Sequence, residues 1–146
     1  MRPEDRDPVM AILAHWNMAP VSPSAEIPHP ERTGIEIDHS FVAIDGSRVV
    51  GVCSYILLSD AVAETASLAV HPEYKGSGAG YALQTARLAE MKSRGIKKVR
   101  TESDRPETID WYIRKFGYKV VGRNRKKHPF GLKDIDYWTE LEVDLK

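Results

Sequence analysis

The first limits on this 146-residue sequence come from what it lacks. It has one cysteine, Cys53, so no internal disulfide can form, and no Cys/His cluster has the spacing of a zinc site. No apolar run approaches the roughly 20 residues that cross a bilayer. Residues 1–8 are charged and hold no signal-peptide core. We therefore expect a cytoplasmic protein with no metal and no membrane partner.

An excess of charge of either sign is also missing. Lysine and arginine number 21, aspartate and glutamate also number 21, and the formal net charge is zero. General nucleic-acid binders carry an overall basic excess, so this balance argues against one. The chain has no repeat, low-complexity tract or linker, and 42% of its residues are hydrophobic. These features predict one globular domain over residues 1–146.

The first part of the chain predicts a helix followed by a long loop. Asp7 is expected to cap the helix and Pro8 to lie in its first turn, where a proline costs nothing. A core-facing stripe follows at helical spacing: Val9, Ile12, Leu13 and Trp16. Residues 17–33 contain four prolines and predict a loop.

The rest of the chain predicts a mixed α+β fold. The expected elements, in order, are strands over 41–44, 49–58 and 62–70, a helix over 78–94, a strand over 98–103, a helix over 104–117, and strands over 118–123 and 137–145. The first three strands form an antiparallel meander that turns at Asp45-Gly46. Asp104 and Glu107 have capping-box spacing, and Gly117 is expected to end that helix. The helix over 78–94 is expected to face the sheet through mostly small residues: Ala79, Ala82, Leu83, Ala86 and Ala89.

The most informative segment is the glycine-rich turn Lys75-Gly-Ser-Gly-Ala-Gly80, which joins a strand to a helix. Closely spaced glycines expose backbone N–H groups and a helix N-terminus adds partial positive charge, so the turn suits a pyrophosphate. A P-loop is excluded because Tyr81-Ala82 follows Gly80 instead of Lys-Ser/Thr. A dinucleotide fingerprint is excluded because its third glycine is misplaced. A tight turn with no ligand is the alternative interpretation.

The same turn resembles the Arg/Gln-x-x-Gly-x-Gly/Ala acyl-CoA signature of the GNAT superfamily, with Lys75 in the usual Gln/Arg place. Leu68-Ala-Val-His-Pro72 and Trp111-Tyr-Ile-Arg-Lys-Phe-Gly-Tyr118 are similar to two further landmarks, so the resemblance covers most of the chain. It implies the GNAT fold: a mostly antiparallel sheet of six to seven strands with a V-shaped splay, and helices on both faces. It also implies acetyl-CoA as the acyl donor.

The resemblance assigns cofactor contacts residue by residue. Leu68 and Val70 are expected to pair with the pantetheine through their backbone, and the charge of Lys75 is expected to aid pyrophosphate binding. The other expected cofactor contacts are Gly76, Ser77, Gly78, Ala79, Gly80, Asp104 and Tyr112. Asp104 stands near the place where many relatives have an asparagine.

Acetyl transfer to an amine needs a proton acceptor, an oxyanion donor and a proton donor for the departing thiolate. Glu64 is the expected base, because histone acetyltransferase members of the superfamily have a catalytic glutamate at this offset from the loop. A solvent-facing Glu64 is the alternative, and Asp38 and His39 are rival bases. The Leu68 N–H is the expected oxyanion donor. Tyr112 is the expected acid, with a core aromatic as the alternative.

Two departures from the family pattern carry expectations of their own. Tyr112 lies five residues before Gly117 where four are usual, and we predict that a bulge in the helix absorbs the extra residue. The first strand of the fold is missing or very short. Its absence leaves a sheet edge where a second copy of the chain can pair as a homodimer.

These features together predict an acetyl-CoA-dependent N-acetyltransferase that acts on a primary amine of a small molecule. Acetylation of a protein lysine or N-terminus, and CoA binding without turnover, are alternatives that the sequence leaves open. The basic cluster over residues 123–128 is expected either as a solvated loop or as a site for an acidic acceptor or the 3′-phosphate of CoA. Cys53 is expected to be a core thiol with no catalytic role.

Overall fold

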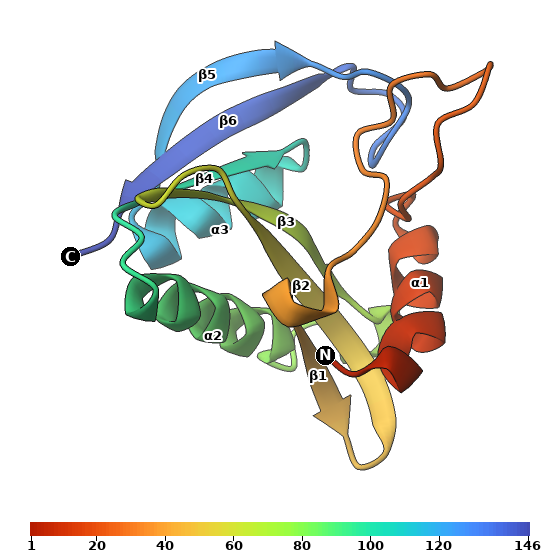
Figure 1. The fold of residues 1–146 in the computed structure, drawn as a ribbon, viewed down its shortest axis with the longest axis horizontal. Coiled ribbons are helices and arrows are strands. Elements are labelled where there is room, and N and C mark those ends of the chain that lie inside the picture. The colour runs from red at the N-terminus through yellow and green to blue at the C-terminus, as the bar shows by residue number, and fades with distance from the viewer.

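The protein is a six-stranded sheet with α-helices packed against it, and the computed structural model describes all residues from 1 to 146 (Figure 1). The strands are β1 (Ser40–Asp45), β2 (Arg48–Leu57), β3 (Val62–Val70), β4 (Lys98–Ser103), β5 (Lys119–Arg125) and β6 (Tyr137–Asp144). The helices are α1 (Arg6–His15), α2 (Ala79–Ser93) and α3 (Pro106–Phe116), with short 3-10 turns η1 (Pro3–Asp5), η2 (Ile37–His39) and η3 (Pro72–Tyr74). Every strand and helix predicted from the sequence is therefore present.

The strands follow the order β1-β2-β3-β4-β6-β5, so β1 and β5 are the two edges of the sheet. Neighbouring strands are antiparallel except for β3 and β4, which run parallel because α2 makes the crossover between them. The predicted mostly antiparallel sheet is confirmed. No strand precedes α1, since η1 leads directly into this helix, as the sequence also predicted.

Helices cover both faces of the sheet, as the resemblance implied. On one face α1 packs Val9 and Leu13 against Val52. On the other face α2 packs Met91 against Tyr55, and α3 lies on the same side as α2 (Figure 1). Val52 and Tyr55 are three residues apart on β2, and an odd spacing places their side chains on opposite faces of a strand. None of the helices combines the length and the apolar character that a membrane span requires.

Cys53 lies in the interior between β2 and α2. Its side chain is fully buried, and its thiol donates a weak hydrogen bond to the Leu83 carbonyl oxygen, with 3.5 Å between sulfur and oxygen. Burial raises the pKa of the Cys53 thiol. The structure confirms that this residue is a core thiol.

The start of α1 differs from the prediction. Asp5 occupies the N-cap position, and Asp7 lies inside the first turn without capping it. The reason is η1, which begins at Pro3 and extends the helical path toward the N-terminus. The Asp5 carboxylate accepts a hydrogen bond from the Arg2 backbone N–H at 2.8 Å and pairs with the Arg2 guanidinium at 3.1 Å.

The predicted inner stripe of α2 is confirmed at Leu83, which is buried, while Ala79 and Ala86 are half-buried and two positions are wrong. Ala82 and Ala89 are exposed. The buried residues of this helix are Leu83, Gln84, Arg87 and Met91. The helix is rotated relative to the expectation because two polar side chains find buried partners beneath it.

The capping box predicted for α3 is also wrong. The helix begins at Pro106 with Arg105 at the N-cap position and no side-chain capping bond, because the Asp104 carboxylate is bound elsewhere. Gly117 ends the helix at φ +73°, as predicted. Residues 106–116 are α-helical throughout, so the predicted bulge before Gly117 is absent.

Candidate active site

The glycine-rich turn between β3 and α2 presents unpaired backbone N–H groups. Gly76 and Gly78 have φ of +81° and +90°, a left-handed region that favours glycine. A Cβ at either position would meet nothing within 4 Å, so the backbone conformation, and not space, requires glycine here. Four N–H groups of the turn and the first turn of α2 have no partner in the protein: those of Gly76, Gly78, Gly80 and Tyr81.

Two side chains complete this turn. Ser77 Oγ accepts a hydrogen bond from the Ala79 N–H at 3.3 Å, and Lys75 is exposed at the rim of the adjoining cleft. The N-terminus of α2 adds partial positive charge in the same place. Free amides, a helix N-terminus and a lysine at one point have the geometry of an anion site.

Strands β3 and β4 diverge beyond their first residues. They pair only where Val62–Glu64 meets Lys98–Arg100. Farther along β3 a bulge places Ser67 and Leu68 together opposite Cys53 of β2, and Ser67 has φ +52°. The V-shaped splay that the resemblance implied is therefore present, and the bulge lies on one of its arms.

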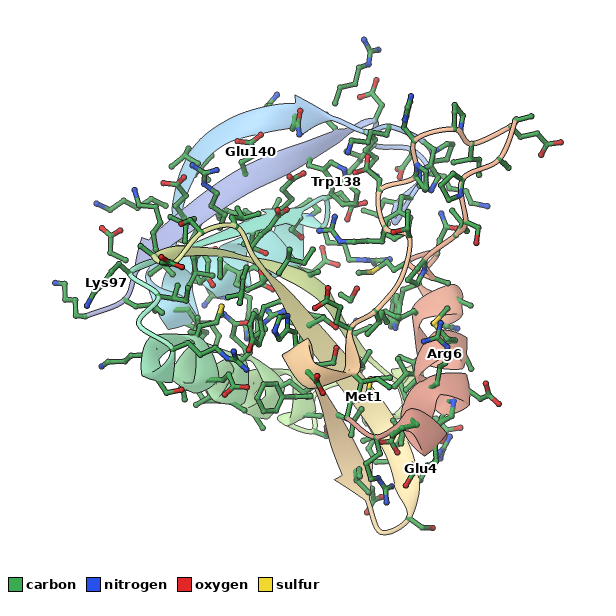
Figure 2. All side chains as sticks on the ribbon, viewed as in Figure 1. Met1, Glu4, Arg6, Lys97, Trp138 and Glu140 are labelled. Atoms are coloured by element: carbon green, nitrogen blue, oxygen red, sulfur yellow. The ribbon has the colours of Figure 1, made fainter.

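A cleft of about 260 Å³ occupies the splay. Residues 65–70 of β3 form one wall and residues 101–105 at the end of β4 form the other. Two loops that are distant in sequence close it, with Trp16, Met18, Glu31 and Arg32 from the first and Phe130, Gly131 and Trp138 from the last hairpin and its strand. Figure 2 places Trp138 on β6 near these loops. The cleft thus joins the glycine turn, through Lys75, to a partly aromatic chamber.

The structure distinguishes two glutamates at this cleft. Glu64 forms an ion pair with Arg32, with 3.5 Å between its Oε1 and the guanidinium, and does not line the cleft. Glu102 lines the cleft and has no hydrogen-bond or ion-pair partner. Burial raises the pKa of Glu102 to about 7; the carboxylates of Glu64, Glu140 and Glu31 add to the rise, and Arg32 opposes it.

The two rival bases lie away from the cleft. Asp38 is exposed on η2. His39 stacks on Tyr55 with 4.8 Å between ring centroids, and its Nδ1 lies 2.8 Å from the Glu36 carboxylate. Neither side chain lines the cleft, so the structure does not bring them together with the acyl-CoA turn.

Tyr112 is buried beneath the sheet. Its hydroxyl accepts a hydrogen bond from Arg87 Nη2 at 3.2 Å, its ring lies 5.0 Å from the ring of Tyr118, and it is absent from the cleft lining. Without a bulge in α3, the extra residue before Gly117 turns this side chain toward α2. Leu68 of the β3 bulge packs against the Tyr112 cluster, so the hydroxyl lies behind the cleft wall.

Asp104 fastens the last hairpin to the end of β4. Its carboxylate accepts hydrogen bonds from Lys126 Nζ at 2.8 Å and from the Leu132 N–H at 2.7 Å. A Cβ on Gly131 would lie 2.5 Å from Asp104 Oδ2, so a side chain at this position would displace the carboxylate from its partners. Lys126 is 4% exposed and lies over the Trp138 ring, so this member of the basic cluster is an internal tether and not a solvated side chain.

Sequence reasoning missed Glu102 and Trp138. No motif marks Glu102, and Asp104, two residues later, lies beyond the end of β4. Trp138 is buried and its indole N–H has no partner. No local pattern marks it, because the loops that surround it come from both ends of the chain.

Comparison with known families decides the classification. The model of the Acetyltransferase (GNAT) family matches residues 9–118. The chain belongs to the GNAT acetyltransferase family. A comparison with curated protein sequences found no match.

Solved structures with this fold include several GNAT proteins. Ard1 from Thermoplasma volcanium is 19% identical, with a TM-score of 0.77 over 100% of this chain and 95% of that one. The ribosomal-protein-S18-alanine N-acetyltransferase from Escherichia coli is 17% identical, with a TM-score of 0.73 over 100% and 91%. An aminoglycoside 6′-N-acetyltransferase complexed with coenzyme A is 18% identical, with a TM-score of 0.69 over 98% and 92%. These likenesses show the GNAT fold, and the family supports acetyl transfer from acetyl-CoA.

Proposed function

We propose that this GNAT protein transfers an acetyl group from acetyl-CoA directly to a primary amine of a small molecule. The observation that carries the proposal is the continuity of the cleft. At one end it reaches Lys75, the first residue of the glycine turn with its free amides, and at the other it holds the unpartnered Glu102 beneath two loops.

The glycine turn is proposed to bind the pyrophosphate of acetyl-CoA. The N–H groups of Gly76, Gly78 and Gly80 would donate to it, with Lys75 supplying charge. The backbone of Leu68 and Val70 would pair with the pantetheine along the arm of the splay that has lost its β4 partner. The acetyl group would then lie beside the β3 bulge.

Glu102 is proposed to accept the proton of the amine, in preference to Glu64. A free primary amine has a pKa near 10 and is mostly protonated at neutral pH. A general base works best when its own pKa lies near the working pH, and the pKa of Glu102 is raised to about 7. Glu64 is engaged by Arg32, which makes it the weaker candidate.

The chemistry balances without a covalent enzyme intermediate. The neutral amine nitrogen attacks the thioester carbon, and the Leu68 N–H is proposed to stabilise the oxygen as it becomes negative. The new C–N bond forms, the C–S bond breaks, and CoA leaves as a thiolate that takes up a proton. Water is proposed to supply that proton in place of Tyr112, because the Tyr112 hydroxyl lies outside the cleft, behind the wall formed by Leu68. No thiol nucleophile is required, in keeping with the buried Cys53.

A protein N-terminus is the second candidate acceptor. The observation in its favour is that one structural neighbour, the ribosomal-protein-S18-alanine N-acetyltransferase, aligns over the whole of this chain. The cleft of about 260 Å³ and its cover by two loops favour a small amine.

The test is release of free CoA thiol from acetyl-CoA with two panels, one of small primary amines and one of peptides with free N-termini. We expect turnover with members of the first panel. Turnover confined to peptides would move the acceptor to a protein N-terminus. Acetyl-CoA binding with no thiol release from either panel would favour a binding module, and no acetyl-CoA binding would overturn the proposal.

A further inference from the structure

Arg87 is a buried cation in the middle of the fold. It comes from α2, its side chain is fully buried, and no carboxylate lies within ion-pair distance of it. Its guanidinium is always protonated in proteins. Burying a charge costs several kcal/mol, and apolar residues of similar volume usually pack such a place at least as stably. Packing alone therefore does not account for an arginine here.

Neutral groups satisfy the guanidinium instead of a counter-ion. Nε donates to Gln84 Oε1 at 3.0 Å, and Nη2 donates both to this amide oxygen and to the Tyr112 hydroxyl, the latter at 3.2 Å. Nη1 donates to two backbone carbonyl oxygens, those of Ser54 at 2.9 Å and Ala66 at 3.1 Å. This set of hydrogen bonds, here called the fork, thus links α2 to β2, β3 and α3 at one point.

That point lies directly before the β3 bulge. Ser54 and Ala66 face each other across β2 and β3, and the extra residue of the bulge follows at Ser67. The Ala66 carbonyl and the Ser67 N–H belong to one planar trans peptide, so they point in opposite directions. Because Arg87 holds the carbonyl toward α2, this peptide plane is fixed, and the Ser67 N–H is turned away from α2.

The orientation of this peptide determines where the next one points. Leu68 follows Ser67 in the bulge, lines the cleft and packs its side chain against the Tyr112 cluster. A left-handed residue such as Ser67 is held only where its surroundings fix it, because this conformation is strained for a residue with a side chain. Arg87 supplies that restraint from beneath the sheet.

We infer that Arg87 is a positioning residue for acetyl transfer. It holds the Ala66–Ser67 peptide, and through it aims the Leu68 N–H at the thioester oxygen of acetyl-CoA. Arg87 touches no reacting atom; it acts through the backbone of β3. The inference rests on the proposed function and adds to it a residue from the interior of α2.

The test compares Arg87→Met, which removes the fork, with the wild-type protein loaded with acetyl-CoA that carries ¹³C in its carbonyl. In the wild-type protein, the carbonyl stretch of the bound thioester should lie below that of free acetyl-CoA, because the Leu68 N–H polarises it. In Arg87→Met the stretch should return toward the free value. The turnover number kcat should fall about tenfold to a hundredfold, while the Kd of acetyl-CoA changes by less than about threefold, since the glycine turn is untouched.

Met91→Ala is the matched control. Met91 is fully buried on the same helix, one turn beyond Arg87, and packs in a cluster with Tyr55, Ala63 and Val99 that contains no residue of the bulge. This variant should lower the Tm without moving the carbonyl stretch or kcat at temperatures where it is folded. Two milder variants serve if Arg87→Met does not fold. Arg87→Lys keeps the charge but loses the fork, and Gln84→Met leaves the guanidinium less constrained; both should give partial shifts of the same sign.

The outcomes separate this inference from the proposed function. A folded Arg87→Met, or failing that Arg87→Lys and Gln84→Met, with the wild-type carbonyl stretch and kcat would overturn the role of Arg87 alone. A wild-type stretch equal to that of free acetyl-CoA would also overturn it, because no N–H would then be aimed at the oxygen. A wild-type protein that binds no acetyl-CoA would overturn the proposed function, and the role of Arg87 with it.

Discussion

The half of the cleft assigned to acetyl-CoA comes from one continuous segment, residues 68–80, and it acts largely through backbone groups. The half assigned to the acceptor is assembled from segments at both ends of the chain and acts through side chains such as Arg32, Glu102 and Trp138. We therefore expect the first half to tolerate most side-chain changes and to depend on backbone angles. We expect the second half to depend on the charge and burial of individual residues.

The same contrast appears in the electrostatics. The glycine turn offers partial positive charge from free amides and Lys75, with no acidic partner to offset it. Around Glu102 the carboxylates of Glu64, Glu140 and Glu31 outnumber Arg32. A cleft that is positive at one end and negative at the other can place an anionic donor and a cationic amine in a fixed order. Each prediction below alters one half and asks whether the other responds.

The largest effect is expected from Glu102→Gln, compared with Glu64→Gln. If Glu102 is the base, its variant should lose roughly 10²–10⁴-fold in kcat/KM at neutral pH, while calorimetry should find acetyl-CoA affinity nearly unchanged. The wild-type kcat/KM should rise with pH through about 7, because protonated Glu102 cannot accept a proton. Glu64→Gln should change the plateau rate by no more than about twofold. The opposite pattern, with the large loss in Glu64→Gln, would return the base to Glu64.

The next effect tests the backbone half with Gly78→Ala. Alanine at φ +90° is strained, so the turn should relax and move its amides, lowering acetyl-CoA affinity about tenfold or more. Gly46→Ala is the matched control, since Gly46 has φ +61° in the β1–β2 turn with open space around its Cβ site. Both variants should lose similar stability in urea, and only Gly78→Ala should lose affinity. Equal affinity for the two would remove the glycine turn from the binding site.

A smaller effect concerns stability. The pKa of Glu102 is about 7 in the folded protein and near 4.5 in the unfolded chain, so the neutral side chain stabilises the fold below pH 4.5, and this contribution is lost as pH rises through 7. The glutamine of Glu102→Gln cannot ionise, so the stability of this variant does not fall as pH rises through 7. Its free energy of unfolding should exceed that of wild type by about 1–2 kcal/mol at pH 8 and match it near pH 4.5. Urea denaturation at the two pH values measures this, and a variant that is less stable at pH 8 would contradict it.

The smallest effect is expected from Arg32→Met. Arg32 lowers the pKa of Glu102, so its loss should move the midpoint of the kcat/KM profile to higher pH and leave the plateau rate similar. Arg100→Met is the control, because Arg100 pairs with Glu142 at 3.0 Å on the exposed side of β4 and is not among the groups that shift Glu102. An unmoved midpoint in Arg32→Met would show that the rate reports a different group.

The order of elements and the glycine turn could be predicted from the sequence, because both depend on local periodicity and on residues close together in the chain. Strands at 62–70 and 98–103 and the left-handed glycines follow from such patterns. The predictions that failed were those in which a distant partner decides. Asp104 has the spacing of a helix cap, yet Lys126 and Leu132 bind its carboxylate.

The half of the cleft assigned to the acceptor was harder to predict, because distant residues determine its structure as well. Glu64 and Glu102 look alike as strand glutamates, and they differ because a distant loop brings Arg32 to Glu64, while Glu102 lines the cleft without a partner. Arg87 occupies a position where the pattern of α2 predicts an apolar stripe, and its partners lie on β2, β3 and α3. The spacing of nearby residues predicts neither the difference between the two glutamates nor the burial of Arg87.

The buried Cys53 makes the protein a reporter of its own unfolding. A thiol with no exposed surface and a raised pKa reacts with a disulfide reagent only when β2 separates from α2. In an assay that measures free thiol, the folded protein therefore gives no signal, and the early signal comes from the CoA thiol alone. A slow rise in the thiol signal that continues after the acetyl donor is exhausted measures the rate at which the sheet opens. A single assay therefore reports turnover and kinetic stability on separate timescales.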